Sequence, residues 1–170
     1  METYLAIASR REVREYSERS VPEELRIRIV EAGRVAGSSV NRQQWRFILI
    51  EDRELLDRLA DLVYAPSNLR GADFAIAVAV HGKGPIQFDA GRAAQNMMLA
   101  AWDAGVGSCP NGMPDREPVR DALGLGEGEE VVTILSLGYP ARPVDPARRP
   151  PAEWIARAKR KAFDEVVVRR

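Results

Sequence analysis

The chain has 170 residues, and its 25 Lys and Arg residues balance 25 Asp and Glu residues. This length suits one domain with a substantial core, and the zero net charge excludes binding to nucleic acid or to an anionic membrane through overall charge. Cys109 is the only cysteine, which excludes a disulfide within the chain and a site of several thiolates, so a reducing compartment is expected.

The first residues do not have the pattern of a signal peptide. Glu2 places an acid where a signal peptide carries basic residues, and no apolar run approaches the length of a membrane span. We therefore expect a cytoplasmic protein that is not inserted in a membrane.

A short helix is expected over residues 3–9, and a dense group of arginines follows it. This arginine segment contains Arg10, Arg11 and Arg14. Three guanidinium groups within five residues have the density of an anion-binding site. Acids alternate with them at Glu12, Glu15 and Glu18. On charge alone, the simpler interpretation is a solvated segment with surface ion pairs.

Residues 22–36 predict an amphipathic helix, with Pro22 in its first turn and acids beside its positive end. It leads into a polar loop at residues 37–45, which is rich in hydroxyl and amide side chains. Such neutral groups on a rigid support suit a flat, uncharged polar ligand. The alternative is an ordinary helix exit, in which the same side chains only turn the backbone.

The middle of the chain mixes strands with helices, which favours an α/β or α+β layer structure. In chain order we expect a strand at 46–50, a helix begun by Asp52, a loop at 64–71, a buried strand at 74–80, a central helix begun by Asp89 and ended by Gly105, a strand that breaks into a loop at 106–114, a short helix at 115–123 and a strong strand at 130–138. Gly112 in the second of these loops lets backbone N–H groups approach a ligand closely.

The last thirty or so residues differ from the rest, since they are basic and rich in proline. The prolines predict a stiff, extended linker, followed by a basic helical turn at 154–161 and a last strand at 163–168. A strand placed beyond such a linker can pair with a second copy of the chain. We therefore expect a homodimer.

No residue pattern supplies its own catalytic chemistry. The motif Gly-x-Ser-x-Gly is absent, and nothing ties Cys109 to the lone His81. One histidine and one cysteine leave no set of metal ligands, so no metal is expected. Neither a Walker A motif nor Gly-x-Gly-x-x-Gly follows a strand. Two basic clusters, the arginine segment and residues 159–161, flank a chain whose neutral polar loops lie at 38–44 and 110–113. Together they suit a cofactor with a phosphate at one end and a flat heteroaromatic ring at the other.

Six motifs in chain order resemble the FMN-dependent nitroreductase family. They are Arg10-Arg11-x-Val13-Arg14-x-Tyr16, Gly37-Ser-Ser-x-Asn-x-Gln43-x-Trp45-Arg-Phe47, Asp89-x-Gly-x-Ala-x-Gln-Asn-x-x-Leu-Ala-Ala101, Gly105-Val-Gly-Ser-Cys109, Leu137-Gly-Tyr-Pro140 and Arg160-Lys-x-Phe-Asp-Glu165. The resemblance implies an α+β fold of three layers, with a mixed, mostly antiparallel sheet flanked by helices. It also implies one FMN-binding domain over residues 1–170, whose tail from about residue 141 embraces the partner of a homodimer and swaps its C-terminal strand into it.

The resemblance further implies an FMN site at the subunit interface, built from both chains. The residues expected to bind the flavin phosphate and ribityl chain are Arg10, Arg11 and Arg14, together with Arg160 and Lys161 from the tail. The loop that the partner subunit contributes in this family corresponds to Gly37, Ser38, Ser39, Asn41 and Gln43. The loop over the isoalloxazine falls on Pro110, Asn111, Gly112 and Met113, and Asn68 and Arg70 are candidates near the ring and the substrate. No catalytic side chain is expected, because flavin N5 carries the chemistry.

The chain departs from the family pattern at three positions. Glu12 stands where Ser is common, and Gly37 and Gln44 stand where Pro is common. A carboxylate at Glu12 would be repelled by a phosphate unless it points away, so Glu12 is left out of the site. The short chain also leaves little room for a large lid.

The activity implied by the resemblance is that of an oxidoreductase in which NAD(P)H reduces FMN, and FMN then reduces a nitro compound, a quinone or a similar small oxidant by a ping-pong mechanism. Two alternatives stay open. One is a specialised enzyme of the same fold that destroys flavin, dehalogenates its substrate or reduces deazaflavin. The other is a non-catalytic flavin-binding sensor. A nucleic-acid binder is disfavoured, because the basic tail lacks interleaved aromatic residues.

Overall fold

The computed structural model describes residues 1–170 and divides the chain into two compact units. The larger unit is Arg11–Val144, and the smaller unit combines Met1–Arg10 with Asp145–Arg170. The smaller unit contains α1 (Thr3–Ser9), the 3₁₀ turn η2 (Pro146–Arg148), α7 (Pro151–Arg157) and α8 (Phe163–Val166). Within it, α1 packs against α7 and η2.

The larger unit is built from a four-stranded sheet and five α-helices. Its elements are α2 (Glu23–Arg34), the 3₁₀ turn η1 (Ser39–Asn41), β1 (Trp45–Ile50), α3 (Arg53–Ala60), α4 (Pro66–Arg70), β2 (Phe74–His81), α5 (Ile86–Asp103), β3 (Gly107–Asn111), α6 (Glu117–Ala122) and β4 (Glu129–Gly138). The strand order is β1-β2-β4-β3, and every neighbouring pair is antiparallel. The only parallel component is an isolated bridge between Glu12 and Ser108.

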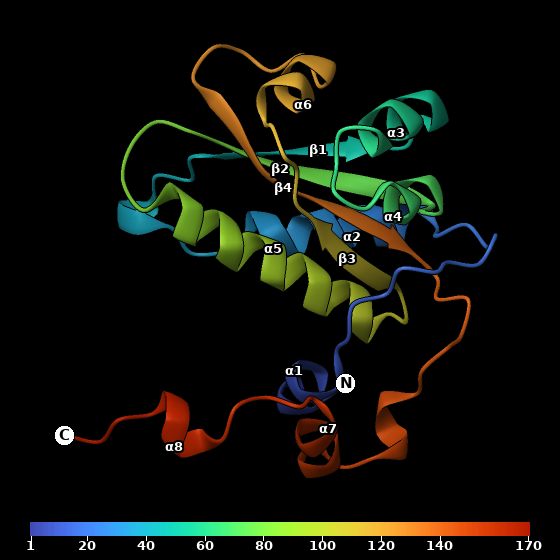
Figure 1. Ribbon diagram of the computed structural model, residues 1–170, viewed down its shortest axis with the longest axis vertical. Coiled ribbons are helices and arrows are strands. Elements are labelled where there is room, and N and C mark those ends of the chain that lie inside the picture. The colour runs from blue at the N-terminus through green and yellow to red at the C-terminus, as the bar shows by residue number, and fades with distance from the viewer. The chain divides into compact units, whose positions relative to one another are not determined.

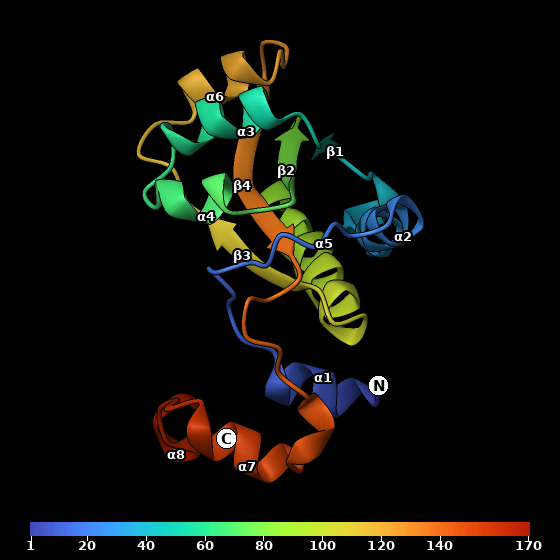
Figure 2. The same ribbon diagram turned by 90° about the vertical axis from the view of Figure 1, so that its right-hand side faces the viewer.

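Helices cover both faces of this sheet, as the two views in Figures 1 and 2 show, with α2 and α5 on one face and α3, α4 and α6 on the other. The alternation of side chains along β2 explains the arrangement. Phe74, Ile76 and Val78 belong to the core on the α2 and α5 side, whereas Ala75 and Ala77 belong to the core on the opposite side. Because both faces are buried, the strand is a continuous apolar run. The predicted three-layer α+β fold is confirmed.

Two local predictions in this unit were wrong. The segment 64–71, expected as a loop, contains the single helical turn of α4, in which Pro66 occupies a favourable first position. The central helix begins before Asp89, since Pro85 is the N-cap of α5, and Asp89 lies in its first turn. The end of that helix was predicted correctly, because Gly105 adopts a left-handed conformation with φ of 77° immediately after the C-cap.

The predicted strand at 163–168 was also wrong for the single chain. Residues Phe163–Val166 form α8, and the Glu165 carboxylate accepts a hydrogen bond from the backbone N–H of Ala162 at 2.8 Å. A strand needs a neighbouring strand to satisfy its backbone groups, whereas one helical turn satisfies part of them locally. Insertion of this segment into a partner subunit stays a prediction.

Residues 11–17 of the arginine segment lie along the end of the sheet formed by β3 and β4. The N–H of Val13 donates to the carbonyl of Ser108 at 3.0 Å, and the N–H of Ser17 donates to the carbonyl of Tyr139 at 2.8 Å. Two glycines make this approach possible: a Cβ at Gly107 would lie 2.6 Å from the Val13 Cβ, and one at Gly138 would lie 3.0 Å from the Tyr16 ring. These contacts with the ends of β3 and β4 fix the position of residues 11–17.

We predict that Gly107→Ala lowers the free energy of unfolding by about 1–3 kcal/mol, because the new methyl group overlaps Val13 in a packed contact. Gly126→Ala is the control, since its Cβ would lie at an ordinary 3.5 Å from the nearest side-chain atom. Thermal or chemical denaturation compares the two variants. An equal effect of both would contradict this packing.

Candidate functional site

The arginine segment borders a cavity of about 400 Å³ within the larger unit. Three guanidinium groups line it, from Arg11, Arg14 and Arg142, and Trp102 of α5 contributes to its wall. Glu12 and Glu15 also line it, so the cavity carries three cations against two carboxylates. The side chains that line the cavity therefore carry a net charge of +1, which favours an anion.

Glu12 is oriented by the same backbone pairing that holds the segment. Its residue bridges Ser108 of β3, and its Oε2 atom is buried. A buried oxygen does not face a ligand that approaches from solvent. Glu12 nevertheless lines the cavity, and its exclusion from the anion site stays a prediction.

A chain of hydrogen-bonded side chains, three of them buried and Tyr16 half-buried, runs from the arginine segment across β4 and β3 to α4. The Tyr16 hydroxyl lies 2.7 Å from the Val13 carbonyl and 3.0 Å from Ser136 Oγ. Asn111 Nδ2 donates to Ser136 Oγ at 3.1 Å, and Asn68 Nδ2 donates to Asn111 Oδ1 at 2.8 Å. Burial raises the pKa of Tyr16 above its ordinary value, so the phenol stays protonated and remains a donor. We call Tyr16, Ser136, Asn111 and Asn68 the amide network.

The amide network changes the interpretation of two predicted residues. Asn111 was expected in a loop over the ring, but it lies in β3 and is 3% exposed. Met113 packs into the core on the α3 side. Of the four residues predicted there, Pro110 and Gly112 are the exposed ones.

The polar loop at residues 37–43 has an unusual backbone. Val40, Asn41 and Gln43 have φ of 49°, 55° and 52°, in the left-handed region, where each residue with a side chain costs about 1 kcal/mol. The loop is held from two sides. Asp89 of α5 accepts a hydrogen bond from the N–H of Ser39 at 2.9 Å, and Ser38 Oγ accepts one from the N–H of Gln43 at 2.9 Å. Strained conformations of this kind concentrate at ligand-binding sites.

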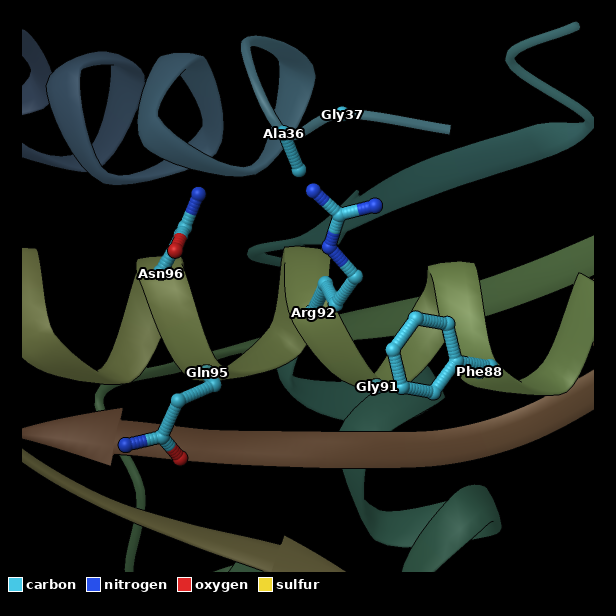
Figure 3. A pocket seen from close by; sticks show the side chains of 7 residues that line it. All are labelled: Ala36, Gly37, Phe88, Gly91, Arg92, Gln95 and Asn96. Carbon is cyan, nitrogen blue, oxygen red and sulfur yellow. The ribbon is translucent and has the colours of Figure 1, made fainter. Parts of the chain in front are cut away.

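Gly37 lies beside Arg92 at a cavity of about 440 Å³ between α5 and the end of α2. Figure 3 shows the Arg92 side chain reaching from α5 toward Gly37 and Ala36. A Cβ at position 37 would lie 2.5 Å from Arg92 Nη2. That atom is the end of a flexible side chain, so a side chain at position 37 would require Arg92 to move, and the structure does not explain this departure from the family pattern further.

The two halves of the predicted site do not meet within one chain. The polar loop is attached to α5 at Asp89, whereas the arginine segment shares its cavity with Trp102, thirteen residues further along the same helix. At 1.5 Å per residue this separation is about 20 Å. Figure 1 shows the loop before β1 near the start of α5, and α4 and β3 toward the far end of the sheet.

The remaining predicted residues have these positions. Arg70 is exposed and pairs with Asp61. Arg10 is the C-cap of α1, and Arg160 and Lys161 are exposed between α7 and α8, so all three belong to the smaller unit. Sequence reasoning missed Ser136, Arg92 and Arg142, which are brought to these sites only by tertiary folding.

No group of three or more His, Cys, Asp or Glu side chains is placed to hold a metal ion. No helix is both long enough and apolar enough to cross a lipid bilayer.

Comparisons with known proteins agree with this fold. Residues 7–81 and 66–139 match the model of the nitroreductase family. A relative from Archaeoglobus fulgidus, provisionally named NADH dehydrogenase/NAD(P)H nitroreductase, is 35% identical over 79% of this chain and 83% of its own length. The chain therefore belongs to the nitroreductase family.

Solved structures extend this comparison. A nitroreductase family protein from Clostridium difficile 630 superposes with a TM-score of 0.83 at 24% identity, over 99% of this chain and 98% of its own, which shows the common fold. An FMN-dependent nitroreductase from Clostridium difficile R20291 has a TM-score of 0.76 at 26% identity, over 88% of this chain and 94% of its own.

We predict that Asp89→Ala releases the polar loop, because Ser39 loses the acceptor for its N–H. Exchange of the Ser39 amide hydrogen should accelerate by about tenfold or more, since a lost hydrogen bond of this type costs about 1–3 kcal/mol. Asp89→Asn keeps an acceptor oxygen and should retain most of the protection. NMR-detected hydrogen exchange measures both, and unchanged protection in Asp89→Ala would show that other contacts hold the loop.

Proposed function

We propose that this protein is an FMN-dependent oxidoreductase that uses NAD(P)H to reduce its bound flavin and then reduces a small oxidant. The proposal rests on the side-chain oxygen of Asn68, Oδ1, which has no hydrogen-bond partner in the chain. Asn68 itself is 4% exposed. The oxygen is not among the fully enclosed unpaired atoms, so it keeps contact with solvent and is open to a donor from a ligand.

The residues at hand fit FMN at both of its ends. Arg11 and Arg14 line a cavity that suits a phosphate, and Arg10, Arg160 and Lys161 are the further cations proposed for it. Asn68 offers an acceptor to the edge of a flat ring, at the other end of the amide network. Pro110 and Gly112 precede and follow Asn111 in the chain, are exposed and carry no polar side chain, and the ring is proposed to lie against them.

We infer that the functional form is a homodimer in which the polar loop of one chain completes the site of the other. Gly37, Ser38, Ser39, Asn41 and Gln43 are the residues of that loop. The separation of about 20 Å along α5 supports this arrangement, because the loop and the arginine segment lie toward opposite ends of that helix and share no cavity within one chain.

The tail has a proposed part in the same dimer. Residues 1–170 then form one FMN-binding domain whose C-terminal part, from about residue 141, reaches onto the second copy. Phe163, Val166 and Val168 support this, since they are 62%, 63% and 78% exposed and apolar side chains of this size gain by being covered.

In this proposal the protein binds and orients, and it uses no side chain as acid or base. Bound FMN supplies a ring that accepts a hydride from a nicotinamide and passes electrons to an oxidant. The arginines hold the phosphate end, while Asn68 sets the rotation of the ring in its plane. Arg70 and the exposed surface beside Asn68 are proposed to meet the substrate.

Reductant and oxidant would use the same open surface in turn, as a ping-pong mechanism requires. The name of the Archaeoglobus fulgidus relative supports NAD(P)H as the reductant, and the Clostridium difficile R20291 structure supports FMN as the cofactor. A nitro compound or a quinone is the proposed class of oxidant. The cytoplasm is the proposed setting, where the lone buried thiol of Cys109 stays reduced.

We predict that the purified protein is yellow and that NADH or NADPH bleaches it rapidly under anaerobic conditions, because the flavin accepts the hydride. Stopped-flow absorbance measures the reduction, and addition of a quinone should restore the colour. Arg10→Ala combined with Arg11→Ala should give a colourless protein, since the phosphate loses charged hydrogen-bond partners.

Arg58→Ala is the control, because Arg58 is an exposed arginine on α3, outside the proposed site. It should keep its flavin. A double arginine variant that retains stoichiometric FMN would overturn the assignment of these residues, and bound flavin that never bleaches would favour a sensor over an oxidoreductase.

A further inference from the structure

We propose that Asn111 is a positioning residue that fixes the side-chain amide of Asn68, so that Asn68 can present only an acceptor to a ring N–H group. This inference rests on the proposed function, because it specifies how the same site recognises the edge of its flavin. It also gives Asn111 a role different from direct contact with the cofactor.

The orientation of the Asn111 amide follows from the atoms around it. Its Nδ2 lies 3.0 Å from the carbonyl oxygen of Cys109, 2.9 Å from that of Ile134 and 3.1 Å from Ser136 Oγ. Two of these three partners are backbone carbonyls, which can only accept hydrogen bonds. If the amide were reversed, its oxygen would face two other oxygens in a buried site. Asn111 must therefore point its NH₂ group toward β4 and its oxygen toward α4.

This orientation determines that of Asn68. Asn111 Oδ1 lies 2.8 Å from Asn68 Nδ2 and needs a donor there. The other side of the same Nδ2 faces Cys109 Sγ at 3.6 Å, which is a weak acceptor. The contact with Asn111 requires the NH₂ group of Asn68 to point inward, and the contact with Cys109 is compatible with it. Its carbonyl oxygen is left for the ligand, and the amide cannot rotate without breaking a buried hydrogen bond.

The remainder of the amide network keeps Asn111 in place. Ser136 Oγ accepts from Asn111 and lies 3.0 Å from the Tyr16 hydroxyl, which also lies 2.7 Å from the carbonyl of Val13. Val13 is part of the arginine segment. The segment proposed for the phosphate and the residue proposed for the ring are thus joined through the side chains of the amide network, three of which are buried.

A fixed acceptor selects one kind of ring edge. The imide N–H of a flavin can donate to Asn68 Oδ1, whereas a carbonyl or an N-methyl group at the same position leaves the oxygen unpaired. Loss of this match costs about 1–3 kcal/mol, which corresponds to a change of about five- to 150-fold in the dissociation constant.

The test compares FMN with its N3-methylated analogue. Wild-type apoprotein should bind FMN at least about tenfold more tightly than the analogue, as measured by quenching of flavin fluorescence. In Asn111→Ala the Asn68 amide is free to rotate, so the preference should fall below about threefold. Asn68→Ala should lose the preference as well, and it keeps the test valid if Asn111→Ala does not fold.

The matched control is Thr133→Val. Thr133 donates to the backbone carbonyl of Asn111 at 3.1 Å, so this variant alters the same neighbourhood without touching the side-chain amide. It should keep the wild-type preference for FMN. A preference that persists unchanged in both Asn68→Ala and Asn111→Ala would overturn the inference.

A second measurement needs no flavin and separates this inference from the proposed function. In ¹⁵N-labelled apoprotein the side-chain NH₂ hydrogens of Asn68 should exchange slowly with water, because they point toward Asn111, and they should exchange rapidly in Asn111→Ala. Rapid exchange in the wild type would overturn the inference even if FMN binds. Slow exchange in a protein that binds no flavin would instead reject the proposed function and leave the orientation of Asn68 supported.

Discussion

The position of the candidate site depends on the contact between the arginine segment and the end of the sheet. Val13 donates to Ser108, and the side chains of Val13 and Tyr16 fill the space left by Gly107 and Gly138. This packing is what allows the Tyr16 hydroxyl to enter the buried interior beside Ser136. Without it the arginines would belong to a solvated strand end, which is what their charge pattern alone suggested.

The amide network extends that contact across the molecule. A buried amide is costly unless its hydrogen bonds are made, and Asn111 uses its oxygen and its NH₂ group on partners from α4, β3 and β4. The polar loop is held by a separate and equally specific contact, from Asp89 to the Ser39 N–H. Each half of the site is therefore held by its own hydrogen bonds within one chain, and a second chain is proposed to bring the halves together.

The sequence predicted those elements and residues whose structure depends on local interactions. The strand β2 was predicted because it is a continuous apolar run, and β4 because it is rich in Val, Ile, Thr and Leu. The end of α5 was predicted because Gly105 has a local conformational role. By contrast, α4 is too short to show a helical period, and Asp89 was taken for an N-cap although its partner is Ser39, fifty residues away in the chain. The strand expected at 163–168 required a neighbour that local propensity cannot supply. Ser136 and Arg92 have no sequence signal, since only the tertiary fold places them beside Asn111 and Gly37.

The most direct test of the composite site is a mixed dimer. One chain carries Arg11→Ala and Arg14→Ala, the other carries Asn41→Ala, and different affinity tags isolate the dimer that contains both. If each site combines the arginines of one chain with the loop of the other, one site in the mixed dimer is fully wild type. The mixed dimer should then hold about half the FMN of the wild-type protein, although each parent variant binds it poorly. A mixed dimer as poor in FMN as its parents would contradict the account, because it would place both halves of the site within one chain.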